Sequence, residues 1–108
     1  MSTASETPVL DTLAAMTIDS FERCGLAPDM LMVARIAALA ASDAPPISYA
    51  AQIEFAIETG MTAEQVQDVL VAIAPIVGTA RVMTAAGNIS EALGIAIAVA
   101  DTESEDQG

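Results

Sequence analysis

Residues 49–70 read YAAQIEFAIETGMTAEQVQDVL, and this stretch predicts two helices separated by a turn. Its apolar residues recur at intervals of three and four, which is the period of a helix with one buried face. Gly60 ends the first helix, because glycine readily takes up the backbone conformations that close a helix. Thr62 opens the second helix in a capping box with Gln65, in which each side chain bonds the other residue's backbone N–H. We expect the pair to form an antiparallel hairpin through Gly60 and Met61.

The remaining sequence predicts three further helices and no strand, since strict alternation of apolar and polar residues never persists. Together with the two above, the expected helices span about 8–23, 28–41, 47–59, 62–77 and 79–100. Gly25 is expected to cap the first helix in the left-handed conformation, and Pro28 suits the first turn of the second. The first helix is expected to pack inward through one apolar face, which comprises Val9, Leu10, Leu13, Ala14, Thr17 and Phe21. The prediction is an all-α bundle of about five helices over residues 8–100. A flexible N-terminus at 1–7 and a disordered acidic tail at 101–108 flank it.

The charge balance excludes several kinds of partner. The chain of 108 residues has 15 acidic residues against 3 basic ones and no histidine, for a net charge of −12. Nucleic acids and anionic membrane surfaces attract proteins through basic side chains, so neither is an expected partner. Without histidine the chain lacks an imidazole metal ligand and any Ser–His or Cys–His pair. We therefore expect no metal and no cofactor.

From the cysteine usage and the first seven residues we expect a cytoplasmic protein. Cys24 is the single cysteine, so neither an internal disulfide nor a Cys-x-x-Cys redox pair can form. The first seven residues carry no positive charge and no apolar segment of the kind found in a secretory signal. The apolar segment 80–100 is interrupted by polar residues, among them Arg81 and Glu91, and does not predict a membrane span.

Apolar surface in excess of what one small domain can bury predicts a homo-oligomer, as a trimer or a hexamer. Residues 28–41 are apolar on every side of the helix except at Arg35, which is typical of a helix that is buried all round. Ile95 and Val99 add a second apolar patch to the last helix. A strip of small residues, at which another helix can approach closely, comprises Gly87, Ser90 and Gly94.

From about Leu26 to Gly94, about two-thirds of its length, the chain resembles the carboxymuconolactone decarboxylase family, which includes the alkyl hydroperoxidase D-like proteins. The family pattern joins a histidine-bearing helix to a Gly-hydrophobic-Thr turn and a second helix that ends at a glycine. The residues that fit this pattern in order are Gly60, Thr62, Gln65, Val66, Val69, Leu70 and Gly78. These are capping and core positions, and the resemblance implies the helical bundle of that family.

The reactive residues of the family are replaced in this chain. The family histidine stands eight residues before the glycine, a position held by Gln52, and the two cysteines of the peroxidase branch fall at Pro45 and Ser48. A tyrosine that often precedes the closing glycine is Ile76 here. A peroxidatic thiolate, its resolving partner and a proton-relay histidine cannot be assembled from these side chains, so activity of the peroxiredoxin or alkyl hydroperoxidase type is not expected. Decarboxylation loses its natural acid/base group in the same way.

Five residues remain as candidates for a site. Gln52, Tyr49 and Ser48 are candidate catalytic residues, and Arg35 and Arg81 are candidate ligand-binding residues. Each has a structural alternative: Gln52 and Tyr49 can be satisfied core residues, and either arginine can pair with a carboxylate of the chain instead of an anionic ligand. For Arg35 we favour a carboxylate partner, either within the chain or from a neighbouring subunit, because an unpaired buried charge is costly.

Two classes of function follow from these residues. The first is a diverged family member that binds a small organic acid without a cofactor, or carries out lyase or isomerase chemistry on it, in an apolar pocket beside Gln52, Tyr49 and Arg35. The second is an inert oligomeric scaffold or interaction protein whose ancestral site is filled. A cavity of at least about 300 Å³ at Ser48 and Gln52, with polar groups converging on it, would distinguish the first from the second.

Overall fold

Five helices and no strand make up the part of the chain that the structure describes. A computed structural model describes the backbone of residues 6–107 and the side chains of residues 6–94. The helices are α1 (Pro8–Arg23), α2 (Pro28–Ala41), α3 (Pro46–Glu58), α4 (Ala63–Val77) and α5 (Thr79–Gln107). The predicted all-α fold is confirmed. Most of the predicted flexible N-terminus and the side chains of Ile95 and Val99 lie outside the described residues.

The start of α4 follows the sequence pattern closely. The Gln65 backbone N–H donates to Thr62 Oγ1 at 3.1 Å, and the Thr62 N–H donates to Gln65 Oε1 at 2.8 Å. These two bonds form the predicted capping box. Gly60 lies just before it with φ of 87°, a left-handed value that favours glycine.

Two helix ends differ from the prediction. The chain leaves α1 at Cys24 in an extended conformation, with φ of −76° and ψ of 128°, so the left-handed cap at Gly25 does not form. The linker instead runs directly toward Pro28, which itself restricts the preceding residue to extended backbone. At the other end of the chain, α5 continues past Ala100 to Gln107. The sequence has no glycine or proline between Ala100 and Gly108, and most of the segment that we expected to be disordered is helical.

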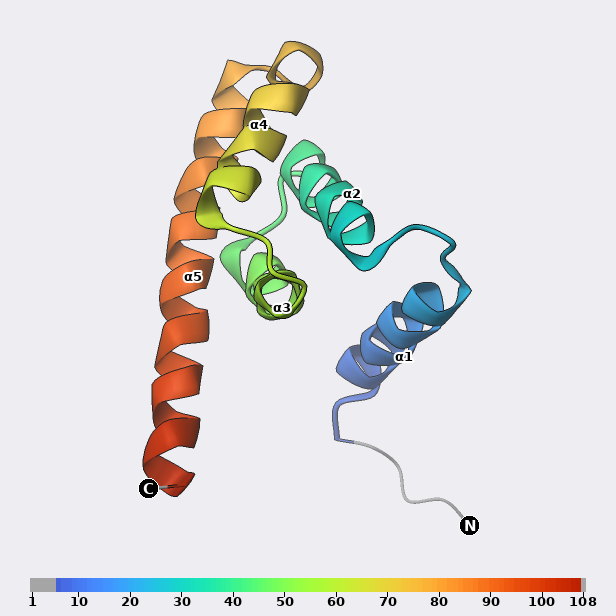
Figure 1. Cartoon of the computed structure of the whole chain (residues 1–108), viewed down its shortest axis with the longest axis vertical. Coiled ribbons are helices and arrows are strands. Elements are labelled where there is room, and N and C mark those ends of the chain that lie inside the picture. The colour runs from blue at the N-terminus through green and yellow to red at the C-terminus, as the bar shows by residue number, and fades with distance from the viewer. Residues whose placement is uncertain (1–5, 108) are drawn as a thin grey trace.

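Helices α2 to α5 form the body of the molecule. α5 packs against α2, α3 and α4, and α2 packs against α3 and α4. The predicted antiparallel hairpin of α3 and α4 is wrong: α3 is seen nearly end-on in Figure 1, whereas α4 lies alongside α5. The reason is that α3 and α4 each pack mainly against α2 and α5.

The core has two clusters of buried residues, and Ile89 packs against both. The first surrounds Tyr49 and comprises Ala40, Ala44, Tyr49, Ala50, Ile53, Leu70, Ala85 and Ala92. The second comprises Leu31, Met32, Ile36, Ala56 and Val69, with Phe21 and Cys24 packed against it from the end of α1. α2 thus buries one face only, and Val33 on another face is 41% exposed. The prediction that α2 is buried all round is wrong within a single chain, because no helix covers that second face.

α1 lies apart from the other four helices (Figure 1). None of its residues is buried, and the apolar face that we expected to pack inward includes Leu10, which is 64% exposed. Contacts near its C-terminal end, through Phe21 and Cys24, hold it to the body. The amphipathic pattern of α1 is therefore real, but most of its apolar face has no partner within the described chain.

Candidate functional site

Two of the predicted site residues, Arg35 and Gln52, meet at an open cavity of about 470 Å³. Arg35 comes from the middle of α2 and donates from one guanidinium nitrogen to Gln52 Oε1 on α3, at 3.1 Å. Its other terminal nitrogen donates to the backbone carbonyl of Thr17 on α1, at 3.2 Å. One side chain thus joins three helices. The cavity is lined by Leu13, Met16, Thr17, Ser20, Arg35, Ala38, Leu39, Ser42 and Gln52.

The guanidinium of Arg35 has no carboxylate partner among the described residues. Within that part of the chain, the ion pair that forms is Arg23 with Asp19, at 2.8 Å on the surface of α1. The prediction of a carboxylate partner for Arg35 is therefore wrong within the described chain, while a carboxylate from a neighbouring subunit stays a prediction. Neutral oxygens of Gln52 and Thr17 take that place, because the fold brings α3 and α1 to this side of α2.

The Phe21 ring on α1 supports the same guanidinium. The central carbon of the Arg35 guanidinium lies 5.3 Å from the centre of that ring, within the range of a cation–π interaction. Two neutral acceptors and an aromatic face orient the positive charge without neutralising it. Since a guanidinium has five N–H donors in a rigid fork, donors remain for an anionic ligand.

Tyr49 and Ser48 lie away from this cavity. The Tyr49 side chain is fully buried in the core, and its hydroxyl has no hydrogen-bond partner among the described residues. Burial raises the pKa of Tyr49, and the negative charge of Asp43 raises it further. Ser48 is half-buried at the start of α3 and donates its backbone N–H to the Pro45 carbonyl at 3.1 Å. Neither residue is in the lining of the Arg35 cavity.

Arg81 also lies apart from Arg35. It is exposed on α5 and donates to the Ala41 carbonyl at the C-terminal end of α2. A cation is favourable there because the carbonyl end of a helix carries partial negative charge. Asn88 Nδ2 donates to the nearby Ala44 carbonyl at 3.1 Å. These two side chains of α5 hold the connector between α2 and α3, so the structure gives Arg81 a structural position.

Sequence reasoning missed the contribution of α1 to the cavity. Leu13 and Thr17 lie on the predicted apolar face of that helix, but nothing in their spacing indicates that they face Arg35. The lone cysteine is not among the lining residues either. Cys24 ends α1, and its sulfur accepts the Leu26 N–H at 3.4 Å.

The described part of the chain has neither a cluster of metal-ligating side chains nor a membrane-spanning helix. No group of three or more His, Cys, Asp or Glu side chains there could hold a metal ion. Likewise, none of the described helices combines the length and apolar character needed to cross a membrane.

A family model described as "Carboxymuconolactone decarboxylase family" matches residues 8–91. The matched range contains α1 to α4, much of α5 and every residue that lines the Arg35 cavity. No curated protein and no solved structure matches the chain.

Proposed function

The chain belongs to the carboxymuconolactone decarboxylase family, and from that premise we propose that it binds a small organic acid at Arg35 and Gln52 without a cofactor. The observation that carries the proposal is the Arg35 guanidinium, held at a cavity of about 470 Å³ with no carboxylate partner among the described residues. A ligand carboxylate can accept two N–H donors of an arginine side by side, in a geometry that favours this pair over others. The cavity volume falls within the range of small-molecule sites.

The cavity supports binding better than acid/base catalysis. Arg35 is the one ionisable side chain in its lining, and a guanidinium has N–H donors but no acceptor to take up a proton. Lyase or isomerase chemistry at this site would therefore rely on Arg35 to stabilise negative charge that develops on the substrate. We do not propose thiol peroxidase activity, because Cys24 is outside the lining and has no second cysteine to resolve it.

We also propose a homo-oligomer, in which a second copy covers apolar surface that one chain leaves open. Large apolar side chains on the first three turns of α1 are at least half exposed, among them Val9 at 70% and Met16 at 61%. The small-residue strip on α5 is open as well, since a methyl group added at Gly87 or Gly94 would meet no atom within 4 Å. These surfaces also favour the second class of function, an oligomeric scaffold.

Titration with benzoate tests the binding proposal. We expect calorimetry to show saturable binding of benzoate to the wild-type protein. Arg35→Met should lower the affinity about tenfold or more, because it removes the charge-assisted hydrogen bonds to the ligand carboxylate. Arg23→Met is the matched control, since it removes the same charge from an exposed position outside the cavity. Equal benzoate affinity in Arg35→Met and the wild type would contradict the proposal, and so would the absence of binding to the wild type.

A further inference from the structure

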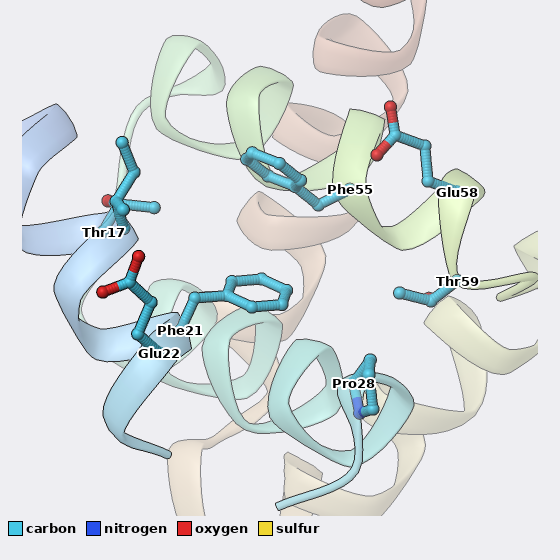
Figure 2. A pocket seen from close by; sticks show the side chains of 8 residues that line it. Thr17, Phe21, Glu22, Pro28, Phe55, Glu58 and Thr59 are labelled. Atoms are coloured by element: carbon cyan, nitrogen blue, oxygen red, sulfur yellow. The ribbon is translucent and has the colours of Figure 1, made fainter.

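A second cavity, of about 400 Å³, lies between α1 and α3 near the start of α2. Its aromatic lining comes from Phe21 on α1 and Phe55 on α3, whose ring centres are 5.8 Å apart with planes tilted by 47°. Figure 2 shows both rings directed into the space between the two helices. Thr17 is common to this cavity and to the Arg35 cavity, but the other lining residues differ.

The two charged side chains that line this cavity, Glu22 and Glu58, are both negative. Glu22 follows Phe21 on α1, and Glu58 ends α3 one turn after Phe55. In Figure 2 the two carboxylates flank the pair of rings from opposite sides. Neither has a hydrogen-bond or ion-pair partner among the described residues, and no basic side chain lines the cavity.

We propose that this cavity binds an organic cation, an ammonium group carried on an apolar body. The face of an aromatic ring is electron-rich and attracts a cation within about 6 Å of its centre. The Phe21 ring already holds one cation in this way, the guanidinium of Arg35 at 5.3 Å. Phe55 offers a second ring that is 38% exposed, and the apolar side chains of Ile18 and Pro28 complete a surface for the ligand body.

Charge selects the ligand class. The carboxylates of Glu22 and Glu58 attract an ammonium group and repel a carboxylate, which is the opposite preference to that of the Arg35 cavity. The net charge of −12 acts in the same direction at long range, because it raises the local concentration of cations. The inference does not depend on the proposed organic-acid site, since it uses a different cavity and ligands of opposite charge.

The test compares the binding of cyclohexylmethylammonium with that of its uncharged analogue cyclohexylmethanol, and NMR detects the binding of each compound. Neither compound has aromatic protons, and the chain has only two Phe and one Tyr, so the protein's ring signals report directly. We expect the ammonium compound to shift the Phe ring signals in a saturable way and to leave the Tyr49 signals unchanged. The alcohol should bind at least about fivefold more weakly, which is the contribution of an exposed charge contact.

Single charge-removing variants locate the site. Glu22→Gln and Glu58→Gln should each weaken binding of the ammonium compound by about two- to fivefold. The matched control is Glu54→Gln, which removes the same charge one turn earlier on α3 but outside the cavity lining, and it should leave the affinity unchanged. Phe55→Leu keeps an apolar side chain and should weaken binding by about two- to fivefold through loss of the cation–π contact.

Four results would overturn the inference: no binding of cyclohexylmethylammonium, equal binding of the alcohol, equal weakening by Glu54→Gln and Glu58→Gln, or unchanged affinity in Phe55→Leu. The failure of benzoate to bind would overturn only the organic-acid proposal. Loss of cyclohexylmethylammonium binding with retained benzoate binding would overturn only the inference made here.

Discussion

Tyr49 shows how one buried polar atom can cost stability without taking part in a site. Its hydroxyl lies in the core with no partner among the described residues, in a chain whose other core residues are apolar. A buried hydroxyl without a hydrogen bond costs about 1–3 kcal/mol. We therefore predict that Tyr49→Phe raises the free energy of unfolding by about 1 kcal/mol at pH 8, measured by urea denaturation. A clear loss of stability in this variant would mean that the hydroxyl has a partner in solution.

The raised pKa of Tyr49 also predicts how stability depends on alkaline pH. Because burial raises the pKa above the ordinary value of 10.0, the folded state holds this proton more tightly than the unfolded state. The contribution of this tighter proton binding to the stability of the fold is fully present below about pH 10. It is lost as the pH rises through the Tyr49 pKa of the folded state. Tyr49→Phe should lack this alkaline loss. Both proteins are compared in a Cys24→Ser background, which removes the single thiol of the chain.

At the scale of elements, the contribution of the α4 capping box to the free energy of unfolding can be measured separately. Thr62 is exposed, and its hydroxyl accepts one N–H of the first turn. Thr62→Ala should lower the free energy of unfolding by about 1 kcal/mol, the usual effect of removing such a cap. Thr84→Ala on α5 is the control, because the Thr84 hydroxyl donates to the Ala80 carbonyl within a helix and caps nothing. Similar losses in both variants would show that the cap contributes nothing of its own.

At the scale of the whole molecule, α1 carries the prediction on assembly. Light scattering at micromolar concentration should give at least twice the chain mass of 11.0 kDa, because the apolar face of α1 is open in a single chain. Leu10→Glu places a charge on that face and should shift the mass toward the monomer. Thr12→Glu adds the same charge to α1 at an exposed polar residue and should leave the mass unchanged. A wild-type monomer would contradict the proposed homo-oligomer.

The sequence by itself determined the helices, most of their ends and the capping box, because these depend on residues within a turn or two of each other. The local signals are the capping residues Gly60, Thr62 and Gln65 and the apolar period of residues 49–70. The family resemblance depends on the same signals.

Only the tertiary structure decided which distant residues meet. The sequence named Arg35 and Gln52 separately, but the bond between them, and the bond from Arg35 to the Thr17 carbonyl, join positions more than 15 residues apart. Helix packing also explains three other findings: Tyr49 lies in the core instead of the site, no described carboxylate lies beside Arg35, and Phe21 pairs with Phe55. Each depends on how whole helices pack, since packing maximises burial over the complete set of apolar faces and no local pattern specifies which faces meet.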